Sequence, residues 1–420
     1  LQSCIDYAKE QNITIRKNRI TAASTQIDVK TAKAAMFPSL SFSTGQQVVN
    51  RPYQETSSRV SGSEIISSNS KTSYNGNYGL NASWTLYNGN KRLKTIQQEK
   101  LNNQMAELDV ATSENNIQES IAQVYIQILY AAESVKVNEN TLQVSIAQRD
   151  RGQELLNAGS IAKSDLAQLE AQVSTDRYQL VTAQATLEDY KLQLKQLLEL
   201  DGENEMNIYL PTLSDENVLA PLPTKRDVYI SALSLRPEIE ASKLNVEASE
   251  LGINIAKSSY FPTISLSAGI GTNHTSGSDF TFGEQVKNGW NNSIGLSVSV
   301  PIFNNRQTKS AVQKAKLQYE TSMLSLLDEQ KALYKTIESL WLDANSAQQR
   351  YAAANEKLKS TQISYELISE QFNLGMKNTI ELLTEKNNLL QAQQEQLQAK
   401  YMAILNMQLL KFYQGDQLAL

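Results

Sequence analysis

The sequence contains one cysteine, Cys4, and one histidine, His274, among 420 residues. A lone cysteine cannot form a disulfide within the chain, so a disulfide-stabilised fold is excluded. Soft metals such as zinc are bound mainly by cysteine and histidine, and a site of that kind lacks ligands here. The sequence also shows no nucleotide-binding loop and no nucleophile with a histidine partner. We therefore expect no catalytic activity and no cofactor.

Long apolar runs are missing as well. No stretch approaches the ~18 residues of a membrane-spanning helix, and the mean hydropathy is -0.41. That profile does not exclude membrane-spanning strands, because their alternating pattern gives only a weak hydropathy signal. Charged residues make up 20% of the chain and nearly balance, with a net charge of -5. Nucleic-acid-binding proteins carry a basic stripe, so we expect no nucleic-acid partner.

The few glycines and prolines stand in places that repeat along the chain. The motif KAAMFPSLSFS recurs as KSSYFPTISLS 224 positions later, whereas further along Gly159 falls on Gly375, 216 positions later. The two separations differ by eight residues, so one loop between Pro38 and Gly79 must be eight residues longer than its counterpart in the second half. The Ser-rich segment Arg51–Thr72 is the natural place, and we predict a loop there. The chain is therefore a tandem duplication.

Two long stretches, Asn90 to Arg151 and Ile302 to Leu374, contain neither glycine nor proline. Both are rich in Gln, Ala, Leu, Glu and Lys, which favour helix. A helix of ~60–70 residues spans on the order of 100 Å. Apolar residues such as Ile117, Ile121 and Val124 follow steps of four and three, the heptad pattern of helices that pack lengthwise.

Each long helix ends in a glycine-containing segment, LNAGSIAKSDL or FNLGMKNTIEL. Glycine ends a helix readily, and Ser164 or Thr379 can begin the next one. Each half is therefore predicted to contain an antiparallel helical hairpin with its tip at Gly159 or Gly375.

Four segments alternate apolar with small polar residues, the period-two pattern of strands. In YNGNYGLNASWTLYN, Tyr78, Leu80 and Trp84 fall on one face and asparagine and serine on the other. A half-buried sheet of a soluble domain gives the same alternation. Three features favour a membrane location: the polar face lacks Lys and Glu, the segments have the ~10 residues that cross a bilayer, and aromatic residues mark their ends. The predicted aromatic girdle comprises Phe37, Tyr74, Tyr87, Tyr260, Phe261, Trp290 and Phe303.

Four strands cannot close a membrane barrel, because the smallest such barrels have about eight. Open sheet edges in lipid leave backbone groups unpaired at a cost of several kcal/mol each. The barrel is therefore predicted to be shared between chains, with eight strands from two copies or twelve from three. We predict a first repeat over 1–200, a linker over 201–224, a second repeat over 225–410 and a C-terminal segment over 411–420.

This arrangement resembles the TolC-type outer-membrane efflux family over essentially the whole chain. The most similar stretches are LQSCIDYAKEQN, LRPEIEASKLNVEASELGINIAKSSYFPTISLSAG and FNLGMKNTIELL. The resemblance implies a homotrimer in the outer membrane of a Gram-negative bacterium, with a twelve-stranded barrel, a periplasmic α-helical tunnel and an equatorial belt from 201–224 and 411–420.

The same resemblance implies a passive exit duct for small molecules or polypeptides. Its partners would be a periplasmic adaptor, an inner-membrane pump reached through that adaptor, and outer-membrane lipid. The cargo stays open. The alternative is a soluble periplasmic coiled-coil adaptor or scaffold, which shares the long hairpins but usually has only one.

The resemblance further implies a gate at the periplasmic hairpin tips. Asp165 matches the first tip, Lys377 replaces an Arg that pairs with that Asp, and Glu381 would form a ring of three carboxylates. Thr384 stands where relatives often have a second acid, which implies a constriction less repulsive to anions. Alternatively, Asp165 and Glu381 are ordinary helix-start acids that offset the helix dipole. The tip residues expected to dock the adaptor are Asn157, Gly159, Asn373 and Gly375.

Three further features have two interpretations each. The start LQSC loosely resembles an acylation signal at Cys4, but the repeat counterpart Val228 favours a buried apolar position. His274 is expected in a polar loop, where a lone histidine is more often incidental than a ligand. A basic cluster where a strand becomes a helix is either a solvated helix start or a contact with lipid headgroups or peptidoglycan. The cluster consists of Lys91, Arg92 and Lys94.

Overall fold

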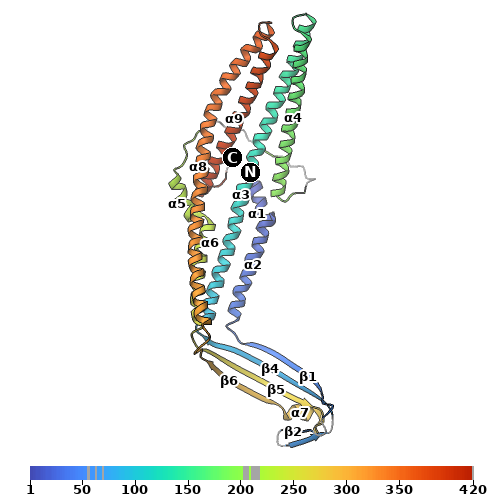
Figure 1. The fold of residues 1–420 in the computed structure, drawn as a ribbon, viewed down its shortest axis with the longest axis vertical. Coiled ribbons are helices and arrows are strands. Elements are labelled where there is room, and N and C mark those ends of the chain that lie inside the picture. Colours follow the sequence, from blue (N-terminus) through green and yellow to red (C-terminus); the bar gives the residue numbers. More distant parts are fainter. Residues whose placement is uncertain (54–56, 62–63, 69–70, 202–207, 210–217, 419–420) are drawn as a thin grey trace. The chain divides into compact units, whose positions relative to one another are not determined.

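The computed structural model describes residues 1–53, 57–61, 64–68, 71–201, 208–209 and 218–418. The chain forms two compact units (Figure 1). Unit 1 comprises Leu1–Ala22, Met105–Lys243 and Ser325–Leu420, and unit 2 comprises Ala23–Gln104 and Leu244–Leu324. Each unit takes segments from both predicted repeats, and the repeat boundaries stay a prediction. No helix in the described ranges is both long and apolar enough to cross a membrane.

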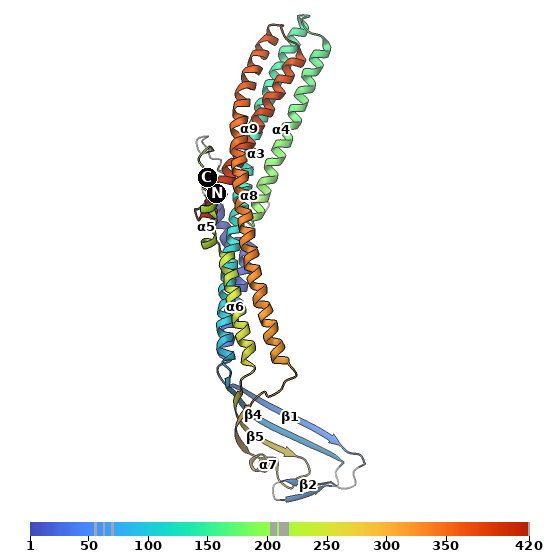
Figure 2. The ribbon, with the colours of Figure 1, turned by 60° about the vertical axis from the view of Figure 1, so that its left-hand side comes forward.

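Two helices of 67 residues each run through the molecule, α3 (Lys91–Asn157) and α8 (Gln307–Asn373). Their bounds differ by the 216 positions that the repeat predicts. The chain returns through α4 (Lys163–Leu197) and α9 (Thr379–Gln414), so that two antiparallel hairpins, α3–α4 and α8–α9, lie side by side in both ribbon views (Figures 1 and 2). The predicted fold class, long helical hairpins combined with four strands, is confirmed for the chain.

Glycine forms both hairpin tips. Gly159 has a φ of 72° and Gly375 a φ of 73°, a left-handed conformation that glycine adopts without steric cost. The helix starts differ slightly from the prediction. The first N-cap is Ala162 instead of Ser164, and the second is Asn378, whose side chain accepts a hydrogen bond from the Glu381 backbone N–H.

Four shorter helices show the same repeat, with α1 (Gln2–Gln11) and α2 (Ile13–Ala34) matching α5 (Lys225–Leu235) and α6 (Pro237–Ser258). Each pair is interrupted by one buried polar residue, Asn12 or Arg236. Asn12 Nδ2 donates to the Leu197 carbonyl at 3.1 Å, and its Oδ1 accepts from the Thr14 N–H at 2.9 Å. Neither break was predicted from the sequence.

Arg236 ties the second repeat to the first. Its Nη2 donates to Glu119 Oε1 of α3 at 2.7 Å, and its Nε lies 3.1 Å from Glu238 Oε1. The guanidinium also lies 3.8 Å from the centre of the Tyr413 ring. Because only 6% of the side chain is exposed, the acidic partners are what compensate its desolvation.

The two larger apolar clusters in the core of unit 1 are related by the repeat. Ile121 of α3 and Leu194 of α4 belong to the first, and their counterparts Ile337 of α8 and Leu410 of α9 belong to the second. The first cluster is larger because it also includes residues of α8 and α9, such as Tyr401. The hairpins therefore share a core within one chain.

The sheet of unit 2 is antiparallel, in the order β1-β4-β5-β6. Its strands are β1 (Ser39–Asn50), β4 (Thr72–Asn88), β5 (Thr263–Thr275) and β6 (Asn291–Ser299). β1 and β6 are the two edges. At the β4–α3 junction Gly89 has a φ of 66°, and a side chain there would meet the Ser258 carbonyl at 2.7 Å. Glycine is therefore required at this turn.

Two loop predictions were wrong. The Ser-rich segment contains a hairpin of β2 (Ser57–Ser61) and β3 (Glu64–Ser68), because the β-branched residues Val60, Ile65 and Ile66 within it favour strands. His274 lies in β5 opposite Gly76, stacked on Tyr78 and against Phe282 of the short helix α7 (Phe282–Asn288). The strand continues past its apolar part, so its end could not be read from the alternation.

Replacing the buried Arg236 with alanine leaves Glu119, whose side chain is 19% exposed, without its cation. We expect the free energy of unfolding to fall by about 3–5 kcal/mol, the usual effect of breaking a buried ion pair. Chemical denaturation in detergent, followed by tryptophan fluorescence, measures this change. The matched control is Lys243→Ala, which removes an exposed pair with Glu240 and should cost at most about 1 kcal/mol. Equal effects of the two substitutions would contradict the role given to Arg236.

Candidate functional site

At the second hairpin tip, two donors bind the carboxylate of Glu381. Lys377 Nζ donates to Glu381 Oε1 at 2.6 Å, and the Asn378 N–H donates to Oε2 at 3.2 Å. Both contacts lower the pKa of the Glu381 carboxyl below its usual value, and the hydrogen bond from Lys377 has the larger effect. The carboxylate therefore stays ionised at neutral pH, with a lysine beside it. Thr384 lies exposed one turn further along α9.

At the first tip, Asp165 occupies the matching position of α4. Its Oδ2 accepts from the Ala162 N–H at 3.0 Å, as Glu381 does from Asn378. Asp165 and Lys377 stand on different hairpins, and within the described part of one chain neither a hydrogen bond nor an ion pair joins them. The predicted pairing of these two residues thus remains a prediction.

A second charged site lies between the hairpins of unit 1. It was not predicted from the sequence. Asp176 of α4 is 1% exposed, Lys386 of α9 3% and Ser145 of α3 2%. Lys386 Nζ donates to Asp176 Oδ2 and to Ser145 Oγ, and Ser145 Oγ donates to Asp176 Oδ2. We call these three residues the inter-hairpin bridge.

Both carboxylate oxygens of Asp176 in the bridge accept hydrogen bonds. The other carboxylate oxygen, Asp176 Oδ1, accepts from Gln172 Nε2 at 2.9 Å, and the same amide nitrogen lies 3.3 Å from Asn387 Oδ1 of α9. Burial lowers the pKa of Lys386, and the Asp176 carboxylate opposes that shift.

The sequence carries a signal that could have found the bridge. Leu166, Leu169, Val173 and then Asp176 follow steps of three and four, as Leu382, Lys386 and Leu389 do. Asp176 and Lys386 therefore occupy core positions of a heptad-like pattern, where a charge needs a partner.

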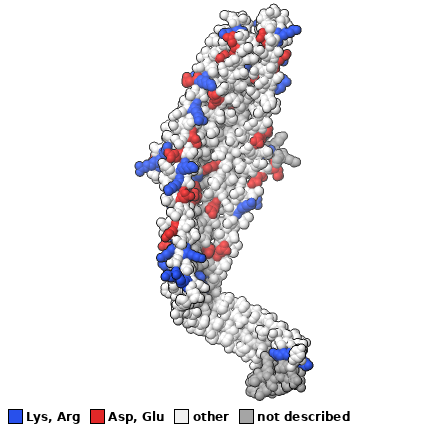
Figure 3. Space-filling model, viewed as in Figure 1, with Lys and Arg blue, Asp and Glu red and all other residues white. Residues whose placement is uncertain are grey.

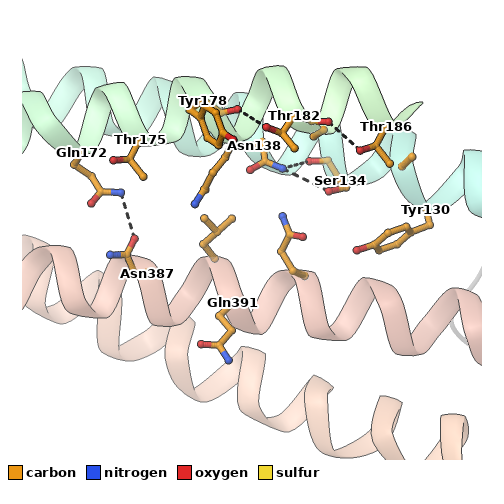
Figure 4. A pocket seen from close by; sticks show the side chains of 15 residues that line it. Tyr130, Ser134, Asn138, Gln172, Thr175, Tyr178, Thr182, Thr186, Asn387 and Gln391 are labelled. Carbon is orange, nitrogen blue, oxygen red and sulfur yellow. Dashed lines mark hydrogen bonds between the residues drawn. The ribbon is translucent and has the colours of Figure 1, made fainter. Parts of the chain in front are cut away.

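A groove of about 640 Å³ lies beside the bridge. Its walls come from α3, α4 and α9, and Figure 4 shows Gln172 and Asn387 pointing toward each other across it. Most of the residues that line it carry a hydroxyl or an amide group. The labelled residues are Tyr130, Ser134, Asn138, Gln172, Thr175, Tyr178, Thr182, Thr186, Asn387 and Gln391.

A second groove, of about 600 Å³, lies between α8 and α9. The repeat relates it to the first, since Ala131 and Ala183 line the first groove where Ala347 and Ala399 line the second. The first groove has α9 as its third wall. The residues known to line the second belong to α8 and α9 alone, so that groove has two walls within one chain.

The predicted girdle residues lie at the two ends of the sheet. Tyr87 pairs with Ile264 near one end, and Tyr74 pairs with Val48 near the other. All except Tyr87 are exposed aromatic side chains. Those at the Tyr87 end are Phe37, Tyr260, Phe261 and Phe303, and Trp290 precedes β6 at the other end.

The four strands of the sheet contain no Lys, Arg, Asp or Glu. Figure 3 shows an uncharged surface over this sheet, whereas charges are frequent on the helices. Large apolar side chains are exposed on both edge strands, among them Phe42 of β1 and Ile294 of β6. An apolar surface of this kind needs a non-aqueous environment or a partner.

The basic cluster has a structural contact that the sequence could not show. Arg92 donates through Nη1 to the Ala35 carbonyl at 3.0 Å and through Nη2 to the Thr85 carbonyl. Lys91 is exposed at the start of α3. Cys4 is half-buried against the first apolar cluster, and burial raises the pKa of its thiol. Among the described residues, no three His, Cys, Asp or Glu side chains gather as a metal site.

Known proteins match this chain over most of its length. The outer membrane efflux protein family matches residues 4–199 and 228–415. The chain is 24% identical over 290 residues to outer membrane efflux protein BepC of Brucella suis biovar 1, covering 69% of this chain and 60% of the relative. It is 23% identical over 296 residues to outer membrane protein TolC of Escherichia coli K12, covering 68% and 58%. The aligned part thus spans less than two thirds of these relatives.

Solved structures show the same fold. The outer membrane protein VceC from Vibrio cholerae superposes with a TM-score of 0.80 at 16% identity, over 100% of this chain and 96% of that chain. The resemblance found in the sequence is confirmed, and with it the location in the outer membrane of a Gram-negative bacterium. The soluble-adaptor alternative finds no support. The chain belongs to the outer membrane efflux protein family.

Proposed function

We propose that the chain is one subunit of a passive exit duct, closed by three copies, through which small molecules or polypeptides leave the cell. This proposal rests on one observation: a single chain leaves two edge strands in the sheet of unit 2 and a groove with only two walls in unit 1. In unit 2, β1 and β6 are unpaired sheet edges. Edges cannot face lipid, so β1 of one copy would pair with β6 of the next.

The helical part is incomplete in a corresponding way. The groove between α8 and α9 lacks the third wall that α9 gives to the first groove. Through the repeat, the counterpart of that wall is the stretch of α4 around Ala171 and Ser174, whose side chains are exposed in the single chain. The α4 helix of a second copy therefore supplies the missing wall. Repetition of this step closes a ring.

The repeat gives the contact between copies at residue level. Within one chain Gln172 and Asn387 are hydrogen-bonded, and their counterparts are Asn388 and Ala171. We expect Ala171→Cys with Asn388→Cys, in a Cys4→Ser background, to join different copies when a short thiol crosslinker is added. Denaturing electrophoresis should then show a ladder that ends at three chains.

The matched control is Gln172→Cys with Asn387→Cys, which should crosslink within one chain and migrate as a monomer. A monomer band alone from the Ala171 and Asn388 pair would contradict the ring. Bands beyond three chains would contradict the trimer.

The gate belongs to the same proposal. In a trimer, three copies of Glu381 would surround the periplasmic opening, with Asp165 and Lys377 beside them. A ring of carboxylates facing a narrow pore favours cations. The Lys377 ammonium reduces the field of each carboxylate, and Thr384 adds no second ring. We therefore propose a constriction with a weak preference for cations.

Replacing Lys377 with alanine should strengthen that preference. We expect the cation-to-anion permeability ratio to rise roughly two- to fivefold, the range that exposed charge interactions produce. Reversal potentials of single channels in a KCl gradient measure the ratio. Lys359→Ala is the control, because its pair with Glu356 is exposed and lies on α8, away from the tip. An unchanged reversal potential for Lys377→Ala would remove Glu381 from the constriction.

The hairpin tips are the proposed docking points of a periplasmic adaptor, through which the duct would reach an inner-membrane pump. Gly159 and Gly375 are exposed and no atom lies near the position of an added side chain. A side chain added there would extend into open space, but the left-handed backbone of both glycines would be strained by it. Asn157 and Asn373, which end α3 and α8, complete this surface.

A further inference from the structure

Basic side chains gather where the helices of unit 2 meet its sheet (Figure 3). The four stretches that join helix and strand there, 29–38, 87–98, 251–262 and 300–313, contain eight Lys or Arg and no Asp or Glu. The whole chain has more acidic than basic residues, 44 against 39. The overall composition therefore does not explain why only cations stand at these junctions.

The helix dipole explains only part of this arrangement. Lys33 and Lys257 lie in the last turns of α2 and α6, where a cation is favourable. Lys91 and Lys309 lie in the first turns of α3 and α8, where the helix dipole disfavours a cation, and neither turn contains an acid. By contrast α4 and α9, which begin at the hairpin tips, have an acid in their first turn. The cations that begin α3 and α8 therefore indicate an anionic partner outside the chain.

Two of the eight cations are engaged within unit 2. Arg92 donates to the Ala35 and Thr85 carbonyls, and Lys94 Nζ donates to the Asn254 carbonyl at 3.4 Å. The other six are exposed, and within the described ranges none of them forms an ion pair. We call these six residues the basic collar: Lys30, Lys33, Lys91, Lys257, Arg306 and Lys309.

Exposed aromatic side chains stand between the collar and the strands along the chain. Lys33 is followed by Phe37 and then by the uncharged strand β1. Lys257 is followed in the same way by Phe261 and β5. After β6 the order is reversed, and an exposed aromatic residue again precedes the cations. This is the order of a bilayer interface, where aromatic rings lie at the level of the headgroups and long basic side chains reach the phosphates.

We propose that the basic collar binds the phosphate groups of anionic phospholipids in the periplasmic leaflet of the outer membrane. Its ligand is a headgroup with a net negative charge, such as that of phosphatidylglycerol. The aromatic rings and uncharged strands beside the collar favour lipid over peptidoglycan, because a polar polymer has no use for an apolar neighbour. The proposal needs the sheet to lie in the membrane, but it does not depend on the number of copies in the ring.

Trp84 is a natural reporter for this leaflet. Its Nε1 donates to the Met36 carbonyl at 2.8 Å, which places it at the helix end of the sheet, whereas Trp290 precedes β6 at the other end. One variant keeps Trp84 and another keeps Trp290, with phenylalanine at the other tryptophan positions. Each is reconstituted into vesicles of phosphatidylcholine and phosphatidylglycerol in equal amounts. One lipid at a time carries brominated acyl chains, which quench tryptophan fluorescence on contact.

We expect Trp84 to show an association constant for phosphatidylglycerol about three- to fivefold above that for phosphatidylcholine, the effect of a basic residue near an anionic surface. The ratio should fall toward one in concentrated salt, which screens exposed charges. Trp290 should show a ratio near one, because the neighbouring helix α7 carries Glu284 as well as Lys287. A ratio near one for Trp84 at low salt would overturn the proposal.

The second test removes the charges in the variant that keeps Trp84. Four glutamines should bring the ratio to about one, whereas four arginines at the same positions should preserve it. The collar positions are Lys33, Lys91, Lys257 and Lys309. The matched control places glutamine at four exposed cations of unit 1, and it should keep the native ratio. The control positions are Lys136, Arg177, Lys331 and Lys335. A folded glutamine variant of the collar with the native ratio would contradict the proposal.

Cosedimentation with purified peptidoglycan tests the other anionic partner at this membrane. Binding that disappears in the glutamine variant of the collar, together with a quenching ratio of one in the native collar, would assign the collar to peptidoglycan and defeat the lipid proposal. The ladder of crosslinked chains tests the ring separately. A collar without lipid preference leaves that ladder unchanged, and a monomer band leaves the quenching ratio measurable.

Discussion

Everything in this molecule depends on pairing the backbone groups at two sheet edges. In lipid an unpaired N–H or C=O costs several kcal/mol, and a four-stranded sheet leaves one row of them on β1 and another on β6. The strands carry no charged residue that would suit these edges to water. The helical hairpins have the same incompleteness, with two walls around the groove of α8 and α9 where the first groove has three. Both units therefore require another copy.

Because of the duplication, the same kind of hairpin packing can occur within one chain and between two chains. The α3–α4 and α8–α9 hairpins have the same register and nearly the same length, with 67 residues in both α3 and α8, 35 in α4 and 36 in α9, so the packing inside the chain is a template for the proposed packing between chains. The two boundaries differ in side chains. A buried carboxylate and a buried ammonium pair across the two hairpins of the chain, whereas the repeat counterparts of Asp176 and Ser145 are the uncharged Ala392 and Thr361.

Much of this architecture could be predicted from the sequence, because helix length, glycine position and period-two alternation are local signals. Gly159, Gly375 and the long stretches without glycine or proline gave the hairpins and their tips. The helix breaks at Asn12 and Arg236 were missed, since their partners Leu197 and Glu119 lie far away in the chain. The same holds for Lys386, which is separated from Asp176 by 210 residues. Lys377 was matched to Asp165 by resemblance, whereas within the chain it pairs with Glu381, its neighbour one helical turn away.

The central claim is that three copies close a ring that none can form alone. Native mass spectrometry of the detergent-solubilised protein tests it most directly. The account predicts a species of three times the 46.8 kDa of one chain, stable until the detergent is removed. A single chain that stays monodisperse without detergent would contradict it.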